Sequence, residues 1–202
     1  MWAVVKKAIN STLGKHTKTI DEICELESYK NFYENLRVTK LTSGNSTDEH
    51  YKLDYNKIRI PANFYATKVF PAVFVVSPSV RIIESRAFES TTGVQSIYIP
   101  PNCEIQNTAF LGSSVVEFNF PNGTKIIEGS VLYNCTKLRQ IDIPYSVKRI
   151  SSFAFGNAAT LKSINYYGTM SDWHLIDKEI NWNKGTGNYT IYCLDGNITK
   201  GT

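Results

Sequence analysis

The sequence has few of the residue patterns that accompany catalysis or metal binding. Its four cysteines, Cys24, Cys103, Cys135 and Cys193, lie far apart, and no pair has the spacing of a zinc knuckle or a thioredoxin-like site. The three histidines lie in three different regions, and none has Cys, Asp or Glu beside it at metal-ligand spacing. No glycine-rich phosphate loop is present. We therefore expect no catalytic residue, no metal and no cofactor, and we interpret the cysteines as free, buried thiols.

Strong charge and long apolar segments are missing as well. The net charge is only +4, from 22 basic and 18 acidic residues, and no dense Lys/Arg stripe is present, which argues against a nucleic-acid partner. No run of 18 apolar residues predicts a membrane span. The N-terminus does not resemble a secretory signal, because Lys6 and Lys7 follow a short apolar stretch rather than precede a long one.

The middle of the chain contains a repeated phrase of the form apolar-x-apolar-Pro, followed some ten residues later by a small residue and a large apolar one. Its prolines are 22, 21 and 23 residues apart. A period of about 20–29 residues is typical of a solenoid. The copies begin at Val75-Val76-Ser77-Pro78, Ile97-Tyr98-Ile99-Pro100, Phe118-Asn119-Phe120-Pro121 and Ile141-Asp142-Ile143-Pro144.

Each copy predicts its own inward and outward positions. In a strand, period-two alternation places the two apolar residues on one face and x on the other, and proline belongs at the strand end because it has no N–H for a ladder. A further isoleucine precedes each large apolar residue by five positions. These residues form the predicted repeat core: Ile83, Phe88, Ile105, Phe110, Ile127, Leu132, Ile150 and Phe155.

The outward row is the candidate binding surface, because repeat proteins use such extended surfaces for recognition. The alternative is that an exposed sheet face must be polar in any case. Phe74, Val76 and Tyr98 at its N-terminal end form a contact patch in one interpretation, and lie beneath N-terminal helices in the other. The candidate partner-binding residues are Phe74, Val76, Ser96, Tyr98, Glu117, Asn119, Gln140, Asp142 and Asn165.

The pattern divides the chain into three parts. Residues 1–50 are predicted to be a helical N-terminal region and loop, residues 51–167 the solenoid with clear repeats from 73, and residues 168–202 a C-terminal cap. In the cap, Trp173 and Trp182 are large enough to cover the open end of the core, as solenoids require.

One further segment resembles the repeat phrase. Ile58-Arg59-Ile60-Pro61 has the apolar-x-apolar-Pro form but precedes Pro78 by only 17 residues. We interpret it as a degenerate or shortened first turn.

The consensus Ile-x-Ile-Pro-x-x-Val-x-x-Ile-x-x-x-Ala-Phe, complete from Ile141 to Phe155, resembles the BspA-like class of bacterial leucine-rich repeats. The match is looser at Pro100-Pro101-Asn102-Cys103 and Val131-Leu132. The tail from Tyr167 is similar to the C-terminal cap often found on such proteins. The resemblance implies a non-catalytic repeat that binds host proteins or other cells at bacterial or parasite surfaces.

A shorter resemblance concerns the N-terminal segment. Trp2 to Leu13, followed by Lys18 to Ile23, is similar to the start of structural or tail-associated proteins in prophages of gut Firmicutes. The missing signal peptide departs from a surface-protein pattern and fits virion assembly or non-standard export. The resemblances leave the localisation open between bacterial surface, phage particle and cytoplasm.

Together these observations predict a mainly β leucine-rich-repeat solenoid with a right-handed superhelix, short strands and little helix, preceded by a small helical region. We expect a non-catalytic module that binds a protein ligand, and a monomer or weak oligomer. The alternative function is a structural or receptor-binding component of a phage tail.

Overall fold

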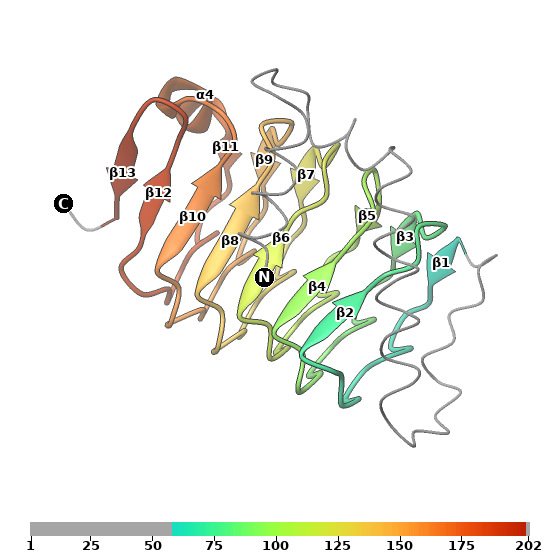
Figure 1. Ribbon diagram of the computed structural model, residues 1–202. Helices are drawn as coiled ribbons and strands as arrows, with labels where there is room; N and C mark the ends of the chain where they lie inside the picture. Colours follow the sequence, from blue (N-terminus) through green and yellow to red (C-terminus); the bar gives the residue numbers. More distant parts are fainter. Residues whose placement is uncertain (1–57, 201–202) are drawn as a thin grey trace, which may run out of the picture.

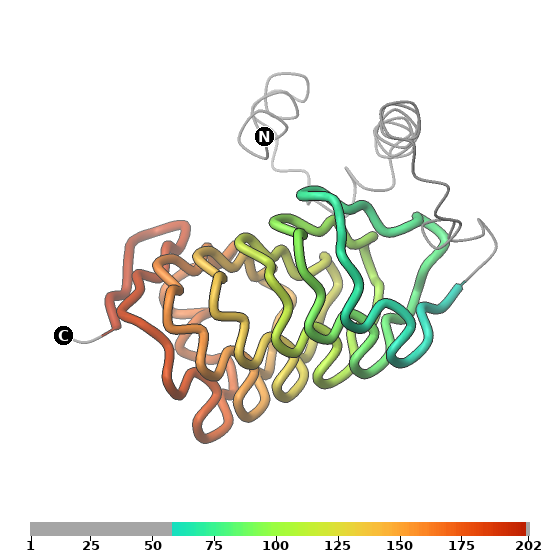
Figure 2. The backbone as a smooth tube through the Cα atoms, turned by 90° about the horizontal axis from the view of Figure 1, so that it is seen from below, coloured from blue at the N-terminus to red at the C-terminus, as the bar shows by residue number. Residues whose placement is uncertain are grey.

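The computed structural model describes residues 58–200, which form a stack of short parallel strands (Figure 1). The predicted N-terminal helices and Cys24 lie outside these residues. The chain winds in successive coils around one axis, as the view from below shows (Figure 2). The mainly β solenoid predicted from the repeat is confirmed, and α4 (Met170–Leu175) is the single α-helix among residues 58–200.

One side of the stack is a seven-stranded sheet. Its order is β13-β12-β10-β8-β6-β4-β2, so consecutive turns lie next to one another, and all pairs are parallel except β12 with β13. Parallel pairing follows from the solenoid path, because each strand is reached after a full turn in the same direction. The strands are β2 (Val73–Val75), β4 (Ser96–Tyr98), β6 (Glu117–Asn119), β8 (Gln140–Ile143), β10 (Ser163–Tyr166), β12 (Thr190–Tyr192) and β13 (Asn197–Thr199).

A second series of two-residue strands contributes the other wall of the core. It forms two separate sheets, β1-β3-β5 and β11-β9-β7, so the ladder is interrupted between β5 and β7. Each two-residue strand except β11 ends on a buried isoleucine. The strands are β1 (Arg59–Ile60), β3 (Ile82–Ile83), β5 (Glu104–Ile105), β7 (Ile126–Ile127), β9 (Arg149–Ile150) and β11 (Asp177–Lys178).

The segment Ile58–Pro61 shows where one interpretation of the sequence is wrong. Its strand β1 pairs with β3, not with β2, so it belongs to the second series and completes a turn rather than starting one. The proline shared with the repeat phrase is a coincidence of composition. The better signal is the spacing from Ile60 to Ile83, which is 23 residues and matches the period.

The eight predicted repeat-core residues are all buried. Successive large residues stack from turn to turn: the rings of Phe88 and Phe110 lie parallel with their centroids 4.8 Å apart. The backbone N–H groups of Phe88 and Phe110 donate to the carbonyls of Ala109 and Val131 in the following turns, at 2.8 and 3.0 Å. These hydrogen bonds join the backbones of neighbouring turns beside the stacked large residues.

Tight corners on each turn use left-handed backbone at residues other than glycine. Such φ values are uncommon outside glycine and asparagine and cost on the order of 1 kcal/mol each. They recur at equivalent positions two residues before each large apolar residue, so the repeat imposes them regardless of side chain. The positions are Asn63, Arg86, Thr108, Ser130 and Phe153, with φ between 55 and 60°.

The C-terminal end of the stack is closed by aromatic residues. Helix α4 begins with a capping box between Thr169 and Asp172 and buries Trp173. The Trp173 ring contacts Tyr166 and Trp182, with centroids 5.3 and 6.1 Å apart. Trp182 in turn contacts Phe155 of the preceding turn, at 5.7 Å. Both tryptophans thus pack on the end of the core.

Candidate recognition surface

The outward face is formed by the alternate residues of the seven-stranded sheet that point away from the core. One row contains Val73, Ser96, Glu117, Gln140, Ser163 and Thr190, and the other contains Val75, Tyr98, Asn119, Asp142, Asn165 and Tyr192. The residues between these rows are apolar and buried, from Phe74 to Ile191. Strand alternation alone therefore separates a core row from two surface rows.

Two of the sequence-predicted binding residues are wrongly placed. Phe74 and Val76 are 8% and 0% exposed, and both point into the core. The error is a one-residue shift of the first copy: Val75, not Val76, pairs with Tyr98. The repeat phrase aligns Pro78 with Pro100, whereas its structural equivalent is the second proline, Pro101. Phe74 and Val76 are therefore removed from the candidate surface.

The other seven candidates, Ser96, Tyr98, Glu117, Asn119, Gln140, Asp142 and Asn165, are brought together in the two outward rows. The alternation of Thr190-Ile191-Tyr192 predicts a strand, but sequence reasoning did not place it on this face. Thr190 pairs with Ser163, 27 positions earlier, and this departure from the repeat period hides its place in the series. Tyr192 is about half exposed and extends the face toward β13.

Asp142 is the centre of a polar network on this face. Its Oδ1 accepts hydrogen bonds from the side-chain amides of Gln140 and Asn165, at 3.0 and 2.6 Å, and its Oδ2 accepts one from the Tyr167 hydroxyl at 2.8 Å. Burial, and then the charge of Asp142, raises the pKa of Tyr167 far above its usual value, so this hydroxyl keeps its proton. Asp142 itself is only 2% exposed.

Tyr98 forms a second centre, on β4. It is 8% exposed, although it lies in an outward row. Burial, and then the carboxylate of Glu117 on the neighbouring strand, raises the pKa of the Tyr98 phenol. Tyr98 is therefore a neutral hydrogen-bonding group at physiological pH. Apart from Tyr98 and Asp142, the members of the face are partly exposed, and Tyr192 is the most accessible of them.

Neither a metal-binding cluster nor an activated thiol is found in the described part of the chain. Among residues 58–200, no group of three or more His, Cys, Asp or Glu side chains could hold a metal ion. The buried thiols of Cys103 and Cys135 have their pKa raised to about 12, chiefly by burial, so they are poor nucleophiles. No helix in the described part is long and apolar enough to cross a bilayer.

Comparisons with known proteins agree with this geometry. Residues 58–175 match the family described as BspA type leucine-rich repeat region, in six copies. The chain also resembles the crystal structure of a leucine-rich cell surface protein from Faecalibacterium prausnitzii, with 27% identity and a TM-score of 0.54. That match covers 59% of this chain and 32% of that protein, so this chain corresponds to about a third of its length. No curated protein matches. Because the family match covers more than half of the sequence, the chain belongs to the BspA-type leucine-rich repeat family.

Proposed function

We propose that this protein is a non-catalytic recognition module that binds a protein partner through its outward face, in the manner of a surface adhesion protein. The observation that carries the proposal is the continuous double row of outward side chains, which crosses β2 to β12 without interruption by a loop. The similarity to a leucine-rich cell surface protein supports the same interpretation.

The composition of the face favours protein over nucleic acid as the partner. Its described side chains are Val, Ser, Thr, Asn, Gln, Tyr and the acids Glu117 and Asp142, with no lysine or arginine in either row. A phosphate backbone would be repelled by these carboxylates. Tyrosine and asparagine, in contrast, provide the adaptable polar and aromatic contacts of protein interfaces.

The phage-tail alternative depends on the N-terminal segment, which lies outside the described residues. No contact within residues 58–200 favours it over surface recognition.

The proposal is tested with the full chain immobilised and a panel of purified extracellular-matrix and cell-surface proteins passed over it. For any protein that binds, Asn119→Lys and Glu117→Lys should weaken binding by about tenfold or more, because each places a long cation within the face. The matched control is Thr136→Lys, an exposed position on a corner of the same stack. Equal binding by all three variants would exclude the outward face as the contact surface.

A further inference from the structure

The repeat stack contains a seam on the side of the two-residue strands. Strand β5 pairs with β3, and β7 pairs with β9, but β5 and β7 do not pair with each other. Hydrogen bonds join the two turns at either end of the gap, from Asn102 N–H to the Asn122 carbonyl at 2.8 Å and from Thr108 N–H to the Gly129 carbonyl at 3.2 Å. Between these points lie two facing strand edges without the ladder bonds that the neighbouring turns make.

The sequence of this turn differs from those of its neighbours. The segments Val76–Ile83, Phe120–Ile127 and Ile143–Ile150 each advance seven positions from one core residue to the next, whereas Ile99–Ile105 advances six. Two consecutive prolines also occupy this short corner, and neither has an N–H to donate. The shortened corner distinguishes this turn from its neighbours, although β5 still pairs with β3, whose corner has the full seven positions.

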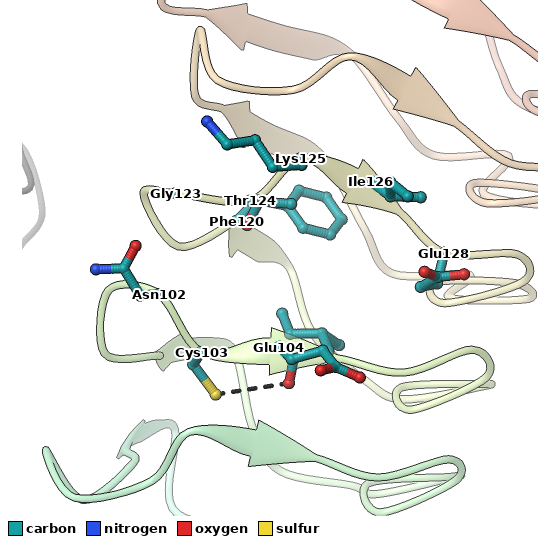
Figure 3. A pocket seen from close by; sticks show the side chains of 10 residues that line it. Asn102, Cys103, Glu104, Phe120, Gly123, Thr124, Lys125, Ile126 and Glu128 are labelled. Atoms are coloured by element: carbon teal, nitrogen blue, oxygen red, sulfur yellow. Dashed lines mark hydrogen bonds between the residues drawn. The ribbon is translucent and has the colours of Figure 1, made fainter.

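A cavity of about 330 Å³ occupies the seam (Figure 3). This volume lies at the lower end of the range for small-ligand sites. Its inner wall is apolar, from Ile105 and Phe120, and its rim carries the carboxylates of Glu104 and Glu128. Figure 3 shows the side chain of Lys125 directed away from both carboxylates, and no ion pair joins Lys125 to them among the described residues.

Glu128 has lost the role that its position has elsewhere in the stack. In three other turns, the residue directly after the two-residue strand accepts a hydrogen bond from a backbone N–H of the preceding turn. Glu84 accepts from Ala62 at 2.9 Å, Gln106 from Ser85 at 3.2 Å, and Glu179 from Ser152 at 2.9 Å.

By this pattern, Glu128 should accept a hydrogen bond from Asn107 across the seam. Within residues 58–200 no hydrogen bond or ion pair involves the Glu128 carboxylate. Burial, and then the charges of Glu104 and Glu179, raises the pKa of this carboxyl group, against a smaller opposite effect of Arg149. A donor supplied from outside would satisfy it.

We propose that the seam binds an arginine or lysine side chain carried on an extended segment of a partner protein. The alkyl part of such a side chain packs against Ile105 and Phe120, and its cationic head donates to Glu128 and Glu104. Backbone groups of the segment meet the open edges of β5 and β7, as in recognition by strand addition. This site does not depend on the outward face, because it lies on the other wall of the stack.

The test uses the ¹⁵N-labelled full chain and the peptide acetyl-Val-Arg-Val-amide. Amide signals of residues 103–105 and 126–128 should shift on titration, while those of the outward face should not. Replacing arginine with citrulline removes the charge and keeps the shape, and should weaken binding about tenfold, as expected for hydrogen bonds to a charged group. The peptide acetyl-Val-Lys-Val-amide shows whether the site requires the planar guanidinium group or only a positive charge.

Protein variants provide the second arm. Glu128→Gln and Glu104→Gln should each weaken arginine-peptide binding several-fold, while Glu89→Gln, on a distant corner beside Arg86, should leave it unchanged. Circular dichroism checks that all three variants fold. The proposal is overturned if no peptide shifts these signals, if citrulline binds as well as arginine, or if Glu128→Gln binds like the parent protein.

Discussion

Two parts of this solenoid are built from the same repeat and differ in how their turns join. From β7 to β11 the turns are paired on both walls, whereas between β5 and β7 one wall is open. The core residues are of the same types on both sides of this boundary, so burial of apolar groups does not require a complete ladder. Backbone register, which depends on the number of residues in a corner, is a separate requirement. The turn with the shorter corner has an interrupted ladder and an intact core.

The largest expected difference between the two parts concerns one core position. Ile150 and Ile105 are equivalent in the repeat, but Ile150 is fully buried and Ile105, which lines the seam cavity, is 8% exposed. Replacement of a buried isoleucine by alanine costs about 2–5 kcal/mol, with the cost rising with the cavity left behind. Ile150→Ala should therefore lie near the upper end of this range and Ile105→Ala near the lower end.

Urea unfolding of the two variants measures this difference. The prediction is wrong if Ile105→Ala destabilises the chain as much as Ile150→Ala, because Ile105 would then be as well packed at the seam as Ile150 is in the fully paired turns. Ile127→Ala, on the far side of the seam and fully buried, is the matched control and should resemble Ile150→Ala.

A one-residue insertion should remove the difference in strand pairing between the two parts. Insertion of one glycine after Asn102 lengthens the short corner to the seven-position advance of its neighbours, so that β5 can pair with β7. Two restored backbone hydrogen bonds would stabilise the chain by about 1–3 kcal/mol in total. Hydrogen exchange should show new protection of the Ile126 and Glu128 amides, at the level already expected for Ser151, whose N–H donates to the Ile127 carbonyl at 2.9 Å.

The same glycine inserted after Tyr145, in a corner that already has the full length, is the control and should destabilise the chain. If both insertions are destabilising, corner length is not the cause of the seam.

The smallest expected effect is electrostatic. The folded state raises the pKa of Glu128, so ionisation of this group opposes folding. The free energy of unfolding therefore decreases as pH rises from the unfolded to the folded pKa of the group. Below the unfolded pKa of about 4.3, the group is protonated in both states and has no effect. Glu128→Gln should raise the melting temperature at pH 7. The gain in the free energy of unfolding should be less than about 1 kcal/mol, because the group is partly exposed to solvent. The gain should vanish near pH 4.

Glu84→Gln should behave in the opposite way. The Ala62 N–H and the Arg59 guanidinium lower the pKa of Glu84, so its ionised form supports folding, and this support is lost as pH falls through the folded pKa. Melting curves of both variants between pH 3 and 8 separate the two cases. A lower melting temperature for Glu128→Gln at pH 7 would show that its carboxylate has a favourable partner.

The repeat period was enough to predict the solenoid, since apolar residues spaced at 22 or 23 positions can only be buried together by stacking. It also located Ile83, Phe110 and Leu132 in the core, because each has a fixed place in the phrase. The period could not show which of two adjacent prolines ends the strand. The one-residue shift at Pro78 therefore exchanged inward and outward positions for Phe74 and Val76.

The polar network of Asp142 and the seam could not be predicted from the sequence, for a different reason. Sequence places Asp142 and Asn165 in one row, but Tyr167 reaches Asp142 from beyond the strand end, which only coordinates can show. The short corner at Pro100–Cys103 is visible as a looser match, yet its consequence is a loss of hydrogen bonds between two segments that are distant in the sequence. In the sequence, Glu128 resembles the other glutamates of the repeat, and only the structure shows that its carboxylate lacks the expected hydrogen bond.

The antiparallel strand β13 has a consequence for how many copies can join end to end. Every other pair in the long sheet is parallel, so an exposed parallel edge would accept a turn from another molecule and allow filaments to grow. Strand β13 reverses direction and presents the exposed, polar Asn197 and Thr199. A second copy arriving at this edge meets the wrong hydrogen-bond pattern and no apolar row. We therefore expect a parallel turn of a second copy to add poorly at this edge.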